Sequence, residues 1–182
     1  MQQKILNSKR GLFQSGMITV LFMGFFAGTL DILSAIIFLA SGHAVAVFRH
    51  IAKAALGNSA LEGGLPVIIL GAIFHYMIAY CFSTGYFLVY PHIPFLKKLN
   101  IISGLLYGIY IWAFMNYLVL PLTFDPPNHA TFQNSWKSIV ILMLAIGMPV
   151  SWITRKYYSG RATTDLVHGA ADIDSNDFPR KT

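Results

Sequence analysis

Charge is scarce in this sequence, and acidic residues are the scarcest. The 182 residues include 13 lysines and arginines but only 7 aspartates and glutamates, so that charged residues make up 11% of the chain. Typical soluble domains carry about 25%. With 55% hydrophobic residues, the chain is too apolar for an ordinary soluble domain. Its cations stand at the ends of apolar runs rather than on a soluble basic face, which argues against nucleic acid as a partner.

Cysteine and catalytic motifs are also lacking. Cys81 is the only cysteine, which excludes an intramolecular disulfide and a cysteine-based metal site. Because Cys81 lies within an apolar run, we expect a buried, inert thiol. The H-E-x-x-H, Walker A and G-x-S-x-G motifs are absent, and His75 alone is deep enough to hold a haem. We therefore predict no cofactor, no metal site and no catalytic residues, with an intramembrane enzyme acting on lipid as a minor alternative.

Long apolar runs are what the chain has instead. Four are long enough to cross a bilayer, which takes about 20 residues, and they cover about 17–40, 66–90, 101–122 and 138–154. The first is longer than the 7–15-residue apolar region of a signal peptide, so we expect an uncleaved span. The predicted fold is an all-α bundle of four transmembrane helices.

The segments outside these runs differ in composition, and each predicts a different structure. Residues 1–16 are predicted to be a cytoplasmic N-terminus, and residues 157–182 a disordered cytoplasmic tail poor in large apolar residues. Residues 43–57 place apolar side chains at helical spacing opposite a basic cluster, which predicts an interfacial amphipathic helix. Residues 58–64 are expected to form a flexible connection to the second span.

The distribution of lysine and arginine predicts the orientation in the membrane. With four spans, both termini and the loop around residues 91–100 lie on one side, and that side carries most of the positive charge. Its cations are Lys4, Lys9, Arg10, Lys97, Lys98, Arg155, Lys156, Arg161, Arg180 and Lys181. The other side has Arg49, Lys53 and Lys137. Because cytoplasmic loops are enriched in lysine and arginine, both termini are predicted to be cytoplasmic.

Glycine pairs mark the surfaces on which the helices are expected to pack. Gly24 and Gly28 in the first span, and Gly104 and Gly108 in the third, form small-xxx-small motifs that let two backbones approach closely. In the second span, Gly71 begins a stripe at intervals of four residues. These motifs fit packing within one chain, and they also fit a homo-oligomer interface.

Asp31 is the only acidic residue in the four apolar runs. A carboxylate near the middle of a bilayer costs about 2.5–3.5 kcal/mol on insertion scales, so it needs a partner, a proton or water. At 1.5 Å per residue, Asp31 and His75 lie about 14 Å from the same side of the membrane, with Asn116 one to two turns shallower. We therefore predict an intramembrane polar cluster of Asp31, His75 and Asn116, serving as a proton or ion relay or as a clasp that fixes helix register.

Several strings together resemble a known group of proteins. They include Gly28-Thr-Leu-Asp31-Ile-Leu-Ser34-Ala35, Gly71-Ala-Ile-Phe-His75, Ser103-Gly-Leu-Leu-Tyr-Gly108, Met115-Asn116 and Gly147-Met-Pro149. The chain resembles a family of small four-span bacterial inner-membrane proteins of uncharacterised function, distantly similar to the YagU-like (DUF1440) membrane proteins. The resemblance covers roughly residues 17–156. It implies a multi-pass protein of the bacterial inner membrane and no particular substrate.

The sequence is compatible with two functions. The first is an integral inner-membrane protein with a structural or interaction role, whose partners are the lipid bilayer and another copy of the chain. The alternative is a small proton-coupled transporter or channel that uses the Asp31, His75 and Asn116 cluster. A conduit would keep Asp31 and His75 accessible to water, whereas a scaffold would bury them dry.

Overall fold

The structure, a computed structural model, describes residues 2–99, 101–124 and 132–161, and this part of the chain is all α-helical without strands, as predicted. The elements in chain order are α1 (Gln2–Ser34), η1 (Ala35–Leu39), α2 (Ala44–Leu56), η2 (Asn58–Glu62), α3 (Leu65–Val89), α4 (Pro94–Leu99), α5 (Ile101–Phe114), η3 (Met115–Val119), η4 (Leu120–Leu122), α6 (Phe132–Ile141) and η5 (Leu142–Gly147). Helix continues over 148–161. The segments η1, η3 and η5 are π-helical, and η2 and η4 are 3-10 turns.

Four helices in the described residues are long and apolar enough to cross a membrane, which confirms the predicted bundle. They are Ser15–Leu39, Leu65–Val89, Ile101–Leu122 and Ser135–Arg161. The first three match the predicted ranges closely because proline and polar residues mark their ends. The fourth, predicted over 138–154, continues to Arg161. Its hydropathy falls at Arg155, but Tyr157 and Tyr158 pack against the Phe87 ring in tilted arrangements, at centroid distances of 5.0 and 5.2 Å, and hold the last turns in place.

Both ends of the described chain are helical. Helix α1 begins at Gln2, so the described part of the predicted cytoplasmic N-terminus is continuous with the first span. The start of the predicted C-terminal tail, 157–161, likewise belongs to the fourth helix. The rest of that predicted tail, 162–182, lies outside the described residues.

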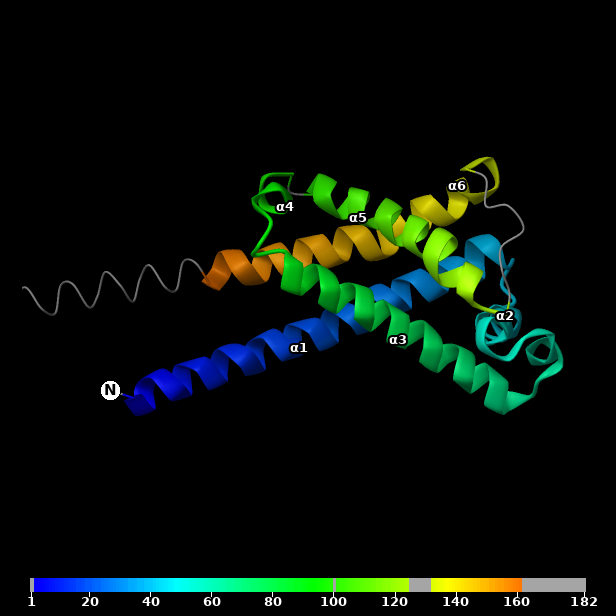
Figure 1. The fold of residues 1–182 in the computed structure, drawn as a ribbon, viewed down its shortest axis with the longest axis horizontal. Helices are drawn as coiled ribbons and strands as arrows, with labels where there is room; N and C mark the ends of the chain where they lie inside the picture. The colour runs from blue at the N-terminus through cyan, green and yellow to red at the C-terminus, as the bar shows by residue number, and fades with distance from the viewer. Residues whose placement is uncertain (1, 100, 125–131, 162–182) are drawn as a thin grey trace, which may run out of the picture.

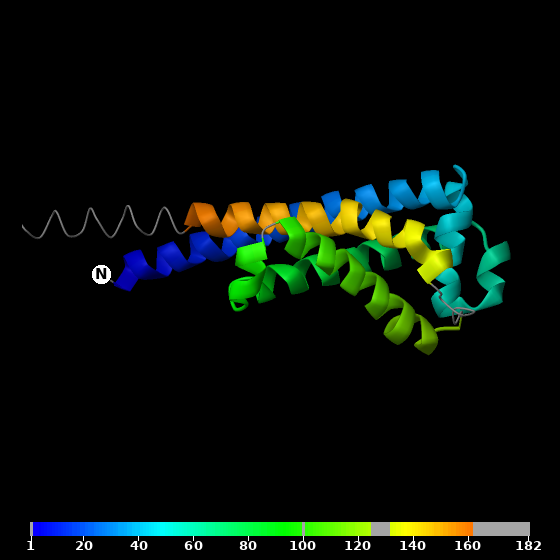
Figure 2. The ribbon, with the colours of Figure 1, turned by 90° about the horizontal axis from the view of Figure 1, so that it is seen from above.

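The bundle has two distinct ends (Figure 1). Helix α2 lies across one end, which we call the α2 end, and the short helix α4 lies at the other, the α4 end. Helices α1 and α3 pack together, and α5 packs against η5. Figure 2, seen from above, shows the same two ends, with α1 and the fourth helix running lengthwise between them.

Helix α2 is the predicted amphipathic helix, and it packs onto the bundle through a glycine. A Cβ on Gly71 of α3 would overlap the backbone carbonyl of Phe48 in α2, so no larger residue fits at this crossing. Gly57, with φ at +71°, ends α2 in a conformation that favours glycine. The connection expected to be flexible instead forms the 3-10 turn η2, anchored by the buried Ala60.

The small-xxx-small glycines lie at contacts within the chain. Gly24 and Gly28 of α1 meet Tyr80 and Ala79 of α3, respectively. Gly104 of α5 and Gly147 of η5 face each other so closely that a Cβ on either would overlap the other's carbonyl oxygen. Close backbone approach of this kind is the main source of packing energy between helices in lipid.

The core lies toward the α4 end, and the outside is apolar, as lipid requires. Eight residues form the buried cluster: Met23, Ala27, Tyr86, Phe87, Tyr90, Ile111, Ile146 and Val150. Large side chains such as Phe25 and Ile73 are exposed outward. Cys81 was predicted to be buried, but its thiol is exposed. Cys81 lies on the exposed side of α3, whereas the buried residues of α3 follow the stripe through Gly71.

Candidate functional site

Asp31 stands on the face of α1 that approaches α3. It follows Gly28 by three residues, and Gly28 contacts Ala79 and Tyr76 of α3. Its side chain is partly buried. Among the four candidate membrane-crossing helices, Asp31 is the one acidic residue. The close approach at the glycines therefore brings this carboxylate against the neighbouring helix.

His75 of α3 is bonded to the same part of α1. Its Nε2 donates a hydrogen bond of 2.8 Å to the carbonyl oxygen of Gly28, and the side chain is 9% exposed. A carbonyl only accepts, so Nε2 carries a hydrogen, and in the neutral ring Nδ1 is left as an acceptor. The Asp31 carboxylate lies close enough to this ring for the two groups to interact electrostatically. In that state, the free Nδ1 and the carboxylate are the two places where a proton can bind without breaking the bond to Gly28.

Asp31 and His75 line one cavity of about 430 Å³, which we call the Asp31 cavity. Its walls come from α1, α2, α3, α5, η3, η4 and η5, and they are apolar except for Asp31, His75, His50 and Thr123. The contribution of His50 and Ala54 from α2 shows that the cavity extends to the α2 end. A space of this size holds several water molecules, at roughly 30 Å³ each, or a small ligand.

Asn116 lies elsewhere, although the sequence groups it with the pair. Its Nδ2 donates a 2.9 Å hydrogen bond to the carbonyl of Trp112 on its own helix, and it does not line the Asp31 cavity. The physical reason is the π-helical turn η3, whose wider i→i+5 spacing changes which residues face the bundle. Met115 and Val119 line the cavity at this level instead.

Two polar residues that line the cavity are not among the site residues predicted from the sequence. His50 belongs to the basic cluster of the helix predicted over 43–57, and in the structure it lines both the Asp31 cavity and a hollow beside the start of α2. Thr123 donates its hydroxyl to the Leu120 carbonyl at 2.7 Å. The cluster of Arg49, His50 and Lys53 was the available signal for α2, but nothing in the sequence showed that α2 covers a cavity.

Below the cavity, toward the α4 end, the bundle is closed. Ile111 and Ile146 line the cavity and also belong to the buried core. Further along α3, the Ser83 hydroxyl is fully buried and has no hydrogen-bond partner among the described residues. Tyr86 then shares a 2.8 Å hydrogen bond with Ser103. The cavity is therefore a blind space rather than a continuous channel.

No comparison with known proteins assigns a function to this site. Comparisons with protein-family models, curated proteins and solved structures find no significant match. In the described residues, no group of three or more histidine, cysteine, aspartate or glutamate side chains is placed to hold a metal ion. Fold and site together define a multi-pass α-helical membrane protein with a carboxylate and an imidazole in one intramembrane cavity. The resemblance to YagU-like proteins stays a prediction.

Proposed function

We propose that this chain is a small proton-coupled transporter of the bacterial inner membrane, with Asp31 and His75 as its proton-binding pair. The observation that carries the proposal is that both side chains line one cavity that extends to the α2 end. A carboxylate in an apolar space is costly unless it is neutralised. Its charge can be neutralised by a proton taken up by Asp31 or His75, or by a small cation. Asn116 is left out of this path because its amide is bonded to its own helix.

The proposed orientation places the α2 end outside the cell. Basic residues at the α4 end include Lys97, Lys98, Arg155 and Arg161, and the α2 end has fewer. Cytoplasmic segments carry the excess of lysine and arginine in inner-membrane proteins. In this orientation the Asp31 cavity receives protons from the outside, where an energised bacterial membrane supplies them. The buried core between the cavity and the α4 end is then the barrier that must open for release.

The test is proton flux in liposomes that contain the purified protein and a pH-sensitive dye. With a pH gradient across the membrane, we expect flux from the native protein and none from the Asp31→Asn variant, because an amide of the same shape does not take up a proton. The matched control is Cys81→Ser, which changes an exposed side chain of α3 outside the cavity. Absence of flux in the native protein, under proton gradients alone and with candidate solutes added, would refute the proposal.

A second function is favoured by the hydrogen bond between His75 and Gly28. This bond joins α1 to α3 at their closest approach, which suits a clasp that fixes helix register in a structural or interacting protein. The two functions differ in what Asp31→Asn does to the amount of protein. A clasp predicts that the variant is degraded in cells, whereas a transporter predicts a normally folded variant without flux.

A further inference from the structure

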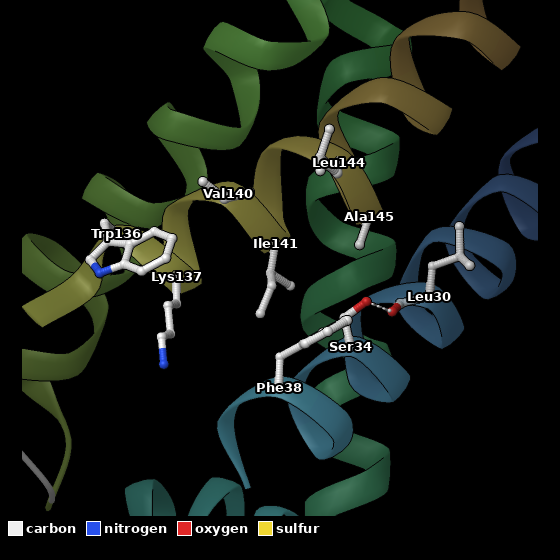
Figure 3. Close-up of a pocket in the computed structure, with 9 residues that line it drawn as sticks. All are labelled: Leu30, Ser34, Phe38, Trp136, Lys137, Val140, Ile141, Leu144 and Ala145. Atoms are coloured by element: carbon white, nitrogen blue, oxygen red, sulfur yellow. Dashed lines mark hydrogen bonds between the residues drawn. The ribbon is translucent and has the colours of Figure 1, made fainter. Parts of the chain in front are cut away.

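A second hollow opens between α1 and the fourth helix at the α2 end (Figure 3), and we call it the Lys137 groove. Its volume is about 460 Å³. Leu30, Ser34 and Phe38 form one wall, and α6 with the start of η5 forms the other. Figure 3 shows the side chains of Lys137, Ile141 and Phe38 extending into the space between the walls. We propose that this groove binds one anionic phospholipid, with an acyl chain between the walls and the phosphate at Lys137.

The walls offer an acyl chain a largely apolar surface. The Ser34 hydroxyl donates a 2.7 Å hydrogen bond to the Leu30 carbonyl within its own helix, so it does not need a ligand. The other lining residues are apolar apart from Lys137 and the Trp136 indole nitrogen. The small Ala145 stands where the two walls approach each other. Such a surface has nothing to recognise in a polar solute, but it packs well against hydrocarbon.

The dimensions of the groove match one leaflet of a bilayer. From Leu30 to Phe38, or from Trp136 to Ala145, a helix rises about 12–14 Å at 1.5 Å per residue. Half of the roughly 30 Å hydrocarbon core is about 15 Å. One acyl chain therefore fits along the groove with its headgroup at the α2 end.

Charge and position select an anionic headgroup. Lys137 is the one charged residue of the groove, and its ammonium group lies 5.9 Å from the centre of the Trp136 ring. Tryptophan and lysine gather at the headgroup level of membranes. The ammonium group thus lies where a lipid phosphate would lie, without a carboxylate in the groove to compete for it.

The experiment is native mass spectrometry of the purified chain with equimolar phosphatidylglycerol and phosphatidylethanolamine. We expect one phosphatidylglycerol to be retained, and Lys137→Ala to weaken its binding about fivefold, the factor for one basic residue at an anionic surface. Lys156→Ala is the matched control. Lys156 also lies near a tryptophan ring, Trp152, at 5.3 Å, but it does not line the groove. Equal losses in the two variants would show only non-specific lipid binding and overturn the proposal.

A second variant tests the groove itself. Val140 is 42% exposed, so Val140→Trp fills the groove without altering the core and should displace the lipid. If this variant does not fold, Val140→Phe provides the same test with a smaller ring. Retention of phosphatidylglycerol by a folded groove-filling variant would contradict binding in the groove. A lipid-free dimer that Val140→Trp dissociates would show that a second copy occupies the groove, and would also overturn the proposal. Neither result depends on whether the chain transports protons.

Discussion

The two halves of the bundle are built differently. The half at the α2 end contains the Asp31 cavity of about 430 Å³ and the Lys137 groove of about 460 Å³. At the α4 end, the hollow beside Tyr86 and Ser103 measures about 190 Å³. The titratable intramembrane pair lies in the first half, whereas the second contains most of the buried core. The α2 half can hold a ligand, and the α4 half seals the bundle.

The two halves also differ in whether their polar side chains bond to the protein or line a cavity. Toward the α4 end, Tyr107 donates to the Phe82 carbonyl at 2.7 Å and Tyr86 pairs with Ser103, whereas the buried Ser83 hydroxyl has no partner among the described residues. In the α2 half, Asp31 lines the cavity beside His75. A buried polar group that bonds to the protein fixes structure, whereas one that faces space is available to a ligand or a proton.

The largest expected effect comes from adding volume to the sealed half. Gly147→Val would place a side chain against the Gly104 carbonyl, and overpacking of this kind costs about 1–3 kcal/mol or more. Ala55 lines the Asp31 cavity and is exposed, so Ala55→Leu should change the free energy of unfolding by less than about 0.5 kcal/mol. Unfolding in mixed detergent micelles measures both. Equal effects would remove the distinction between the halves.

Thiol labelling sharpens the comparison next. In a Cys81→Ser background, Asp31→Cys should react with a charged, membrane-impermeant thiol reagent, because the proposed transport requires the cavity to admit water from the α2 end. Ser83→Cys should stay unlabelled, because Ser83 is fully buried in the other half. Mass spectrometry of the labelled protein gives the extent of reaction. Equal labelling at the two positions would show that the core does not close the cavity.

The smallest expected effect is the loss of one hydroxyl group in the sealed half. Tyr86→Phe removes the hydrogen bond to Ser103, while the 3.3 Å contact between Ser103 and Ser151 remains. Polar contacts between membrane helices average about 0.6 kcal/mol and reach about 1.7 kcal/mol. We expect a loss in this range in the same unfolding assay, with proton flux unchanged. A loss of flux would place Tyr86 on the transport path and blur the division between the halves.

The fold was predictable because its signals are local. Apolar runs bounded by proline and charge predict helices that span a bilayer, and the four spans were confirmed. The juxtaposition of Asp31 with His75 followed from counting 1.5 Å per residue along antiparallel neighbours. That estimate depends only on depth, so it applies as long as both helices are regular up to those residues, and α1 and α3 are.

The remainder was not predictable because it depends on rotation and on packing between distant elements. Asn116 does not line the cavity because the π-helical turn η3 changes which residues of this helix do. His50 lines the cavity because α2 packs over Gly71, and a surface helix by itself does not reveal what it covers. The extension of the fourth helix to Arg161 depends on aromatic contacts with α3 rather than on hydropathy.

The bond between His75 and Gly28 has a consequence for biogenesis. Its two residues are 47 positions apart, and they belong to two consecutive spans that leave the ribosome before the other two described spans. At about 5–20 residues per second, the imidazole follows the carboxylate into the membrane within roughly ten seconds. The first hairpin can therefore shelter its own aspartate before the second hairpin is synthesised. The second hairpin, joined through Gly104 and Gly147, can then dock as a preformed unit.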